Sequence, residues 1–160
     1  MQTLVDINQK NLAALSGLLT IPEYDRDALR TGIVHVGVGG FHRAHQAFYT
    51  DGLLRQDQGD GWGICGVCLL ERDKGMYDVL KAQDGLYTLV IKDPAQSGKP
   101  AVLGAVVEYC FAPADPEKVI DRMADPSVKI ITLTITEGGY NFDAKDNSFR
   151  FQEPSVQWDL

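Results

Sequence analysis

The stretch that decides the fold is residues 33–48, which read IVHVGVGGFHRAHQAF. Residues 33–37 form a short and almost continuous apolar run, which is typical of a strand buried on both faces of a parallel sheet. After the glycines, Ala44, Ala47, Phe48 and Leu54 recur at helical spacing and predict a helix of about four turns. The sequence therefore predicts a strand, a glycine-rich turn and a helix in immediate succession.

The turn carries the first two glycines of a dinucleotide fingerprint. Gly37 would permit the tight turn, Gly39 would let the backbone approach a pyrophosphate, and the helix N-terminus would offer unpaired N–H groups to the anion. His42 stands at the place of the third glycine in G-x-G-x-x-G, and the neighbouring Gly40 can relieve the crowding. Such turns also close ordinary strands, but the order of strand, turn and helix favours nucleotide binding. Arg43 could contact a phosphate or pair with a surface acid.

Two acids mark the expected position of the nucleotide ribose. Glu71 and Asp73 follow the second predicted strand, residues 64–70, across an interval longer than the usual ~20 residues. A long first helix and the loop QDQGDGWG account for the excess. A carboxylate at this strand end accepts hydrogen bonds from ribose hydroxyls and repels a 2′-phosphate, which favours NAD over NADP. Arg72, between the acids, could instead tolerate a 2′-phosphate, and both acids could simply be solvated surface charges.

The next part of the chain predicts a helix and a pair of strands. Residues 73–83 read as a helix with Met76, Val79 and Leu80 on one face. Residues 86–92 and 102–111 read as paired antiparallel strands linked by a polar loop rich in Pro, Gly and Ser.

The remaining elements continue the alternation of helix and strand. Asp115-Pro116-Glu117 opens a helix, and residues 128–135 form the last predicted strand. Strands alternating with helices predict an α/β fold with a Rossmann-like, mainly parallel sheet and an antiparallel hairpin as an embellishment. We expect the sheet to be incomplete at the C-terminus, because the final EPSVQWDL shows no further helix and strand.

The chain divides into a leader and one domain. Residues 1–30 are expected to be a leader segment in which Asn8 caps a short helix running to Leu18. Residues 31–160 are expected to form the NAD-binding domain, and a helical substrate domain is expected to be absent. This length suffices for one domain with its own core.

Composition narrows the class of partner. The 160 residues carry a formal net charge of −7, which argues against nucleic acid and anionic membranes as partners. No apolar stretch approaches the ~20 residues that span a bilayer. The start of the chain lacks the basic and apolar regions of a signal peptide, so a soluble, cytoplasmic protein is expected.

No metal site is expected. Cys65 and Cys68 have CxxC spacing, but residues i and i+3 of a strand point to opposite faces, so their sulfurs should diverge. With Cys110 they are expected to be free thiols. His42 and His45 lie one helical turn apart without a third ligand spaced near them.

Four strings resemble one family. IVHVGVGGFHRAHQAFYTD, WGICGV, AQDGLYTLV and KIITLTITEGGYNFD are similar to the mannitol dehydrogenase family of long-chain, metal-independent polyol dehydrogenases. The resemblance implies NAD as the cofactor and hydride transfer from a secondary alcohol, as in the interconversion of mannitol and fructose. The substrate would be a small polyol or ketose, reached through the absent second domain.

The resemblance also implies roles for individual positions. Gly37, Val38, Gly39, Gly40 and Phe41 match the pyrophosphate turn. Asp73 matches the ribose acid, with Glu71 as a neighbour that could substitute. Thr134, Thr136 and Glu137 match the segment that borders the nicotinamide and the substrate cleft, where Glu137 could contact a polyol hydroxyl or simply cap the strand end.

The family's general base is a lysine in a K-x-x-x-x-N-x-x-H segment, and that pattern does not occur in residues 1–160. The base is therefore expected beyond Leu160, no catalytic residue is expected in this chain, and the chain alone is expected to be inactive. The alternatives are a non-catalytic module that binds NAD or a partner, a relative of fructuronate or tagaturonate reductases, and an unrelated α/β protein such as a methyltransferase.

Overall fold

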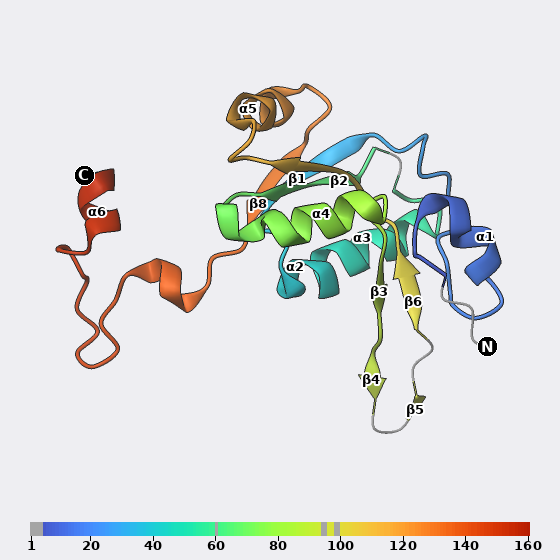
Figure 1. Ribbon diagram of the computed structural model, residues 1–160, viewed down its shortest axis with the longest axis horizontal. Helices are drawn as coiled ribbons and strands as arrows, with labels where there is room; N and C mark the ends of the chain where they lie inside the picture. The colour runs from blue at the N-terminus through green and yellow to red at the C-terminus, as the bar shows by residue number, and fades with distance from the viewer. Residues whose placement is uncertain (1–4, 60, 94–95, 98–99) are drawn as a thin grey trace.

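The computed structural model describes residues 5–59, 61–93, 96–97 and 100–160. Its centre is a parallel sheet with the strand order β7-β2-β1-β8 (Figure 1). The strands are β1 (Thr31–Val36), β2 (Gly63–Cys68), β7 (Val106–Phe111) and β8 (Ile130–Leu133). β1 pairs in parallel with β2 on one side and with β8 on the other. The chain therefore builds outward from β1 to β7 and then returns to the other side of β1, as in a Rossmann-type sheet.

Helices cover both faces of this sheet. α3 (Gln46–Leu54) and α4 (Lys74–Ala82) lie on one side, and α5 (Pro116–Ala124) lies on the other (Figure 1). Alternate strand residues supply the two cores: Ile33 and Ile64 pack with Ala47 of α3, whereas Val34 and Val67 pack with Val119 of α5. The prediction of an α/β fold with a mainly parallel sheet is confirmed.

The first predicted helix is two helices rather than one. α2 (Gly40–Ala44) ends at His45, whose φ of −122° and ψ of −86° leave the helical region, and α3 begins at Gln46. The ring Nδ1 of His45 lies 2.8 Å from the carbonyl oxygen of Phe41, which also accepts the His45 backbone N–H. The apolar spacing runs through this break, so the sequence pattern did not reveal it.

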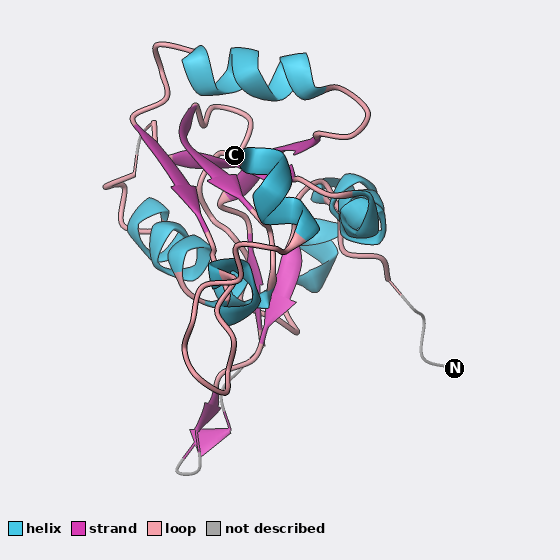
Figure 2. Ribbon diagram, turned by 90° about the vertical axis from the view of Figure 1, so that its left-hand side faces the viewer, coloured by secondary structure: helices cyan, strands magenta, loops and turns pink. Residues whose placement is uncertain are grey.

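The antiparallel hairpin differs from its prediction in extent. β3 (Tyr87–Leu89) pairs with β6 (Ala101–Leu103), and β4 (Lys92–Asp93) pairs with β5 (Gln96–Ser97). β7, predicted to continue the same strand, instead joins the parallel sheet beside β2. The hairpin extends well away from that sheet (Figure 2).

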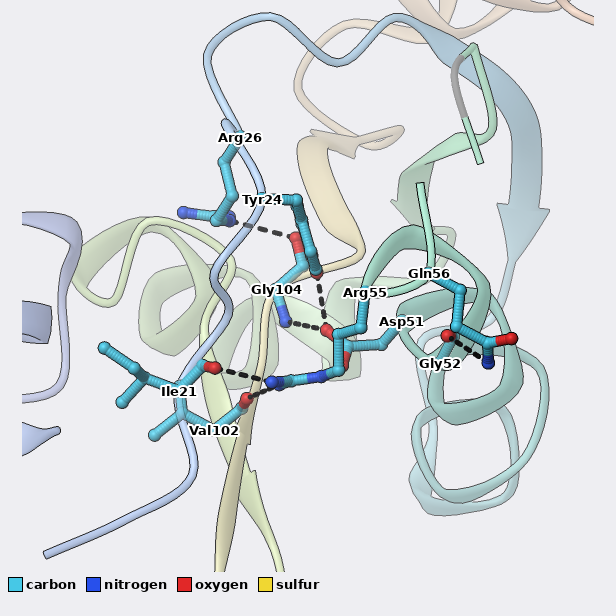
Figure 3. Close-up of polar contacts among 9 residues, drawn as sticks. All are labelled: Ile21, Tyr24, Arg26, Asp51, Gly52, Arg55, Gln56, Val102 and Gly104. Carbon is cyan, nitrogen blue, oxygen red and sulfur yellow. Dashed lines mark hydrogen bonds and ion pairs between the residues drawn. The ribbon is translucent and has the colours of Figure 1, made fainter. Parts of the chain in front are cut away.

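The strand breaks at Gly104 because a buried polar cluster takes both of its backbone groups. The carbonyl of Gly104 accepts from Arg26 Nε at 2.9 Å, and its N–H donates to Asp51 Oδ1 at 2.8 Å. Asp51 also accepts from Tyr24 and Arg55, so the cluster joins the leader, α3 and the start of β7 (Figure 3). A single strand over residues 102–111 was therefore wrong.

The helices around β2 and β7 follow the sequence with one exception. α4 is preceded by a 3-10 turn, η2 (Glu71–Asp73), and buries Leu80 as predicted. Val79, predicted on the same face, is 48% exposed, and Tyr77 packs towards the sheet in its place, against Tyr109. At α5 the predicted acidic start is present, with Asp115 accepting from the backbone N–H of Lys118.

The leader packs on the hairpin. Asn8 caps a 3-10 turn, η1 (Gln9–Asn11), and α1 (Leu12–Leu15) ends before the predicted Leu18. Leu12 packs with Leu86 and Val102, while Thr20 forms an isolated parallel bridge with Ala101. The division of the chain near residue 30 stays a prediction.

The last part of the chain contains more structure than predicted. After η3 (Glu137–Tyr140), Phe142 and Phe149 form an isolated bridge, and α6 (Pro154–Asp159) falls within the segment predicted to hold no helix. The proline at the first helical position explains α6, since its fixed φ suits a helix start. Leu160 follows α6 directly as its C-cap, with its side chain 85% exposed. In the described ranges no strand pairs with the outer edge of β8. Among the helices of these ranges, none has the length and apolar character of a membrane-spanning segment.

Candidate functional site

A cleft of about 810 Å³ opens at the carboxyl ends of β1, β2 and β8. Its lining comes from the last residue of each strand and the segment that follows: Val36–Gly39 at β1, Cys68–Leu70 with Arg72, Asp73 and Met76 at β2, and Leu133–Thr136 with Gly139 at β8. From β1 the chain continues to β2 on one side, and it later returns to β8 on the other side of β1. The topological switch point of the sheet therefore lies at the carboxyl end of β1. Ligands of open parallel sheets bind in the crevice at that point.

The glycine turn after β1 forms one wall of the cleft. Gly37 has a φ of +94°, which a residue without Cβ adopts at little cost. Its N–H donates to the carbonyl of Val67 at 2.9 Å, and its own carbonyl accepts from the N–H of Gly39 at 2.7 Å. Val38 turns its side chain into the core against Gly66, where an added Cβ would lie 2.6 Å from Val38 Cγ2. The turn therefore packs directly against β2.

His42 explains the departure from the three-glycine pattern. Its imidazole is 1% exposed and stacks on that of His35, with ring centroids 3.7 Å apart and planes 7° apart. A third glycine normally allows close packing of helix and strand. Here a pair of flat rings fills the space between α2 and β1. Burial, with the nearby His35 and Arg43, lowers the pKa of His42 to about 3, so the ring is neutral.

The two histidines predicted not to hold a metal have separate surroundings. His42 is buried against His35, whereas His45 is exposed and stacks on Phe41 at 4.3 Å. In the part of the chain that the structure describes, no group of three or more His, Cys, Asp or Glu side chains could hold a metal ion.

The two predicted acids occupy different positions. Asp73 lines the cleft, and its Oδ2 accepts the Leu70 backbone N–H at 2.9 Å. Glu71 is outside the cleft lining and exposed, while Arg72 lines the cleft. The 3-10 turn that begins after Leu70 causes this separation, because it turns Asp73 back towards the strand end.

The segment after β8 forms the opposite wall. Thr134 and Thr136 both line the cleft, and Thr134 Oγ1 lies 3.2 Å from His35 Nε2. The backbone of Glu137 begins η3, and its side chain lies outside the described part of the structure. The catalytic base expected beyond Leu160 falls outside the sequence of 160 residues, so its location stays a prediction.

Three predicted residues flank the cleft without lining it. Gly40 begins α2, and Phe41 is exposed beside His45. Arg43 has its guanidinium carbon 5.6 Å from the centre of the Tyr87 ring, on the hairpin. Tyr87 also donates its hydroxyl to the Arg43 carbonyl at 2.7 Å. The structure therefore places this guanidinium against the hairpin.

Sequence reasoning missed the apolar part of the cleft and His35. The apolar lining residues include Leu69, Leu70, Met76, Leu133 and Ile135. They provide apolar surface of the kind that planar rings of ligands contact. Apolar residues at strand ends look like core in the sequence, and only their exposure distinguishes them: Leu133 is 57% exposed.

The cysteines behave as free thiols. Cys65 lies on the α5 face, 3.8 Å from Cys110 Sγ, and Cys68 lies on the α4 face beneath the cleft. The predicted divergence of Cys65 and Cys68 is confirmed, whereas the contact between Cys65 and Cys110 was not predicted. Burial, with the nearby Asp73, raises the pKa of the Cys68 thiol to about 11.

A parallel sheet that switches direction beside a glycine turn, with an acid at the next strand end, defines a Rossmann-type nucleotide-binding domain. The chain belongs to the mannitol dehydrogenase Rossmann domain family, which residues 31–155 match.

Similar proteins agree with this assignment. The chain is 43% identical to mannitol 2-dehydrogenase of Aspergillus clavatus over 96% of its length, and 41% identical to a mannitol dehydrogenase of Saccharomyces cerevisiae over 99%. It resembles the solved Pseudomonas fluorescens mannitol 2-dehydrogenase in ternary complex with NAD and D-mannitol, with a TM-score of 0.86, 39% identity and 97% coverage. A D-sorbitol dehydrogenase in substrate-free form gives a TM-score of 0.81 at 38% identity and 97% coverage. The chain spans about a third of each of these proteins, at 31% to 32% of their length.

Proposed function

We propose that this chain is the nucleotide-binding part of an NAD-dependent polyol dehydrogenase that transfers a hydride from a secondary alcohol, as in the oxidation of mannitol to fructose. The observation that carries the proposal is the cleft at the switch point, where the Gly37 turn, Asp73 and the two threonines after β8 meet. The similarity to a mannitol 2-dehydrogenase crystallised with NAD and D-mannitol supports the same cofactor and substrate class.

The residues of the cleft fit a dinucleotide from end to end. The Gly37–Gly39 turn, followed directly by α2, would hold the pyrophosphate through backbone N–H groups. Asp73 has one oxygen engaged with Leu70, and its other oxygen can accept from the adenosine ribose. Exposed Leu70 and Leu133 provide apolar surface for planar rings. Gly40, Phe41 and Arg43 would act from the rim of the site.

The chemistry divides between the cofactor and the protein. NAD, when bound, supplies the nicotinamide carbon that accepts the hydride. Thr134 and Thr136 would border the nicotinamide, and Glu137 would face the substrate hydroxyls. The base that removes the alcohol proton would lie in a segment beyond Leu160. The role proposed for this chain is therefore to bind and orient the cofactor.

The biological setting is part of the same proposal. The substrate would be a small, uncharged polyol or its ketose, and the protein would act in the cytoplasm. The acidic balance of the chain, with 22 acidic against 15 basic side chains, supports a partner other than nucleic acid.

Titration of the protein with NAD and NADP tests the proposal, and the two acids provide a matched pair of variants. We expect tighter binding of NAD than of NADP. Asp73→Ala should reduce this preference by about 1–3 kcal/mol, because a charged acceptor for the ribose hydroxyls is lost. Glu71→Ala, two residues away and outside the cleft, should leave the preference unchanged.

Two results would count against the assignment. Equal or tighter binding of NADP by the unmodified protein would contradict the role of Asp73. A larger effect of Glu71→Ala than of Asp73→Ala would place the ribose elsewhere.

A further inference from the structure

His35 is a buried side chain that joins the three segments around the switch point. It lies on β1, and its Nε2 is 3.1 Å from the carbonyl oxygen of Gly37 in the glycine turn. The same nitrogen is 3.2 Å from Thr134 Oγ1, and Nδ1 is 2.8 Å from Thr132 Oγ1 on β8. One ring therefore contacts β8, the turn after β1 and the cleft-lining segment after β8.

The contacts of His35 determine where its proton lies. A carbonyl oxygen only accepts hydrogen bonds, so the contact with Gly37 requires an N–H at Nε2. Burial lowers the pKa of His35, which favours the neutral ring and leaves Nδ1 as an acceptor for the Thr132 hydroxyl. Thr132 Oγ1 also lies 3.1 Å from the side-chain amide oxygen of Gln46. The single hydroxyl proton of Thr132 cannot serve both Nδ1 and this oxygen, so donation to Nδ1 requires a half-turn of the Gln46 amide that presents its nitrogen to Thr132 Oγ1.

The bond to Gly37 fixes the orientation of a peptide plane. In a trans peptide the C=O and the following N–H point in opposite directions. Because the Gly37 carbonyl is turned towards His35, the N–H of Val38 points to the other side of the turn. Among the hydrogen bonds of the described residues, this N–H has no partner, and Val38 lines the cleft.

The same nitrogen directs the hydroxyl of Thr134. Since Nε2 carries a proton, Thr134 Oγ1 can only accept from it, and the hydroxyl proton remains available to the cleft. The ring of His42 stacks on one face of the His35 ring, with centroids 3.7 Å apart, and keeps the His35 ring in this plane. The arrangement leaves His35 little freedom to tilt away from the turn.

We propose that His35 is a positioning residue for the phosphates of the bound dinucleotide: through Gly37 it aims the Val38 N–H, and through Thr134 a hydroxyl, into the cleft. The proposal rests on the function proposed above, because it assigns a role within the same site. A phosphate bound there would meet two oriented donors, whereas a turn with the Gly37 peptide reversed would present a carbonyl oxygen to the anion.

Two substitutions separate positioning from simple packing. His35→Phe keeps a ring to stack on His42 and removes both nitrogens. His35→Gln restores an N–H donor the same number of bonds from the backbone as Nε2. Calorimetric titration of the full protein with NAD, ADP-ribose and adenosine then compares ligands with and without phosphate, and circular dichroism checks the fold of each variant.

We expect His35→Phe to weaken NAD and ADP-ribose about tenfold or more, as for loss of an oriented donor to a charged group. Adenosine binding should stay within about twofold, because it depends on the Asp73 end of the cleft, and His35→Gln should recover most of the ADP-ribose affinity. In the unmodified protein, ¹⁵N NMR of the imidazole should show a protonated Nε2 and a bare Nδ1.

Several results would overturn the proposal. These are ADP-ribose binding to His35→Phe within about twofold of the unmodified protein, an equal loss for adenosine and ADP-ribose, or a bare Nε2 in the NMR spectrum. The NMR measurement decides the matter if His35→Phe fails to fold. Failure of the unmodified protein to bind either NAD or ADP-ribose would instead refute the proposed function, and this proposal with it.

Discussion

Replacement of Asp51 by Asn should destabilise the fold far more than replacement of an exposed aspartate in a similar ion pair. The side chain of Asp51 is 1% exposed and accepts three hydrogen bonds: from Tyr24 at 2.5 Å, from Arg55 Nε at 2.6 Å and from the Gly104 N–H at 2.8 Å (Figure 3). Oδ1 accepts from Tyr24 and Gly104, and Oδ2 accepts from Arg55.

The expected loss of unfolding free energy depends on which of the three hydrogen bonds an Asn side chain can keep. Its oxygen can still serve Tyr24 and Gly104, but its NH₂ group then faces the Arg55 Nε–H, so that two donors meet and the guanidinium loses its countercharge. Breaking a buried ion pair in this way costs about 3–5 kcal/mol, a large part of the ~5–15 kcal/mol that stabilises a typical domain. Asp78→Asn is the matched control, because Asp78 pairs with Lys74 at the same i,i+4 spacing with side chains 54% and 53% exposed. That change should cost less than about 1 kcal/mol.

Urea unfolding at pH 7, followed by circular dichroism, measures both variants. We expect the midpoint of Asp51→Asn to fall sharply at an unchanged slope and that of Asp78→Asn to move little. If Asp51→Asn lost no more stability than Asp78→Asn, the cluster could not be what joins the leader, α3 and the start of β7.

Three further outcomes follow from the structure. Between pH 7 and pH 5 His42 should contribute a fall of about 2 kcal/mol in the free energy of unfolding, because it takes up a proton only when unfolded. Urea titrations of His42→Phe should lack this component, and an equal slope in the variant would contradict the neutral ring. The contribution of His42 is fully present above its unfolded pKa near 6.5 and is lost as the pH falls from there towards about 3. Gly52→Ala should raise the unfolding free energy by about 0.5–1 kcal/mol, since Gly52 lies inside α3 with nothing within 4 Å of an added Cβ; a lower thermal midpoint would show a clash. The thiols of Cys65, Cys68 and Cys110, all buried, should react with a thiol reagent only after denaturation, and rapid labelling of the native protein would contradict their burial.

Local signals in the sequence predicted the elements that local physics determines. The apolar run before Gly37 and the glycines after it specify a buried strand and a tight turn, and both are present. Asp115 and Pro116 specify the start of α5 through a cap and a preset φ. Such elements need only neighbours within a few residues, which the sequence displays directly.

Elements determined by distant contacts were predicted less well. The strand over residues 102–111 breaks at Gly104 because Arg26 and Asp51, 78 and 53 positions away, take its backbone groups. The placement of β7 beside β2 is likewise a pairing across the chain. Nothing in the strand's own residues records either contact.

The candidate site shows the same division. The glycine turn, Asp73, Thr134 and Thr136 were named from the sequence and lie together along the cleft. The choice between Glu71 and Asp73 depended on a 3-10 turn, and the role of His35 depended on a ring stack between β1 and α2. These depend on three-dimensional positions that spacing alone does not encode.

A crystal structure of the full protein with NAD would show whether the cleft at the carboxyl ends of β1, β2 and β8 holds the dinucleotide. We expect the pyrophosphate to lie over the Gly37–Gly39 turn, with an oxygen within hydrogen-bond distance of the Val38 nitrogen, and the adenosine ribose hydroxyls to contact Asp73. NAD bound away from the cleft between the carboxyl ends of β1 and β8, or no NAD at saturating concentration, would contradict this expectation.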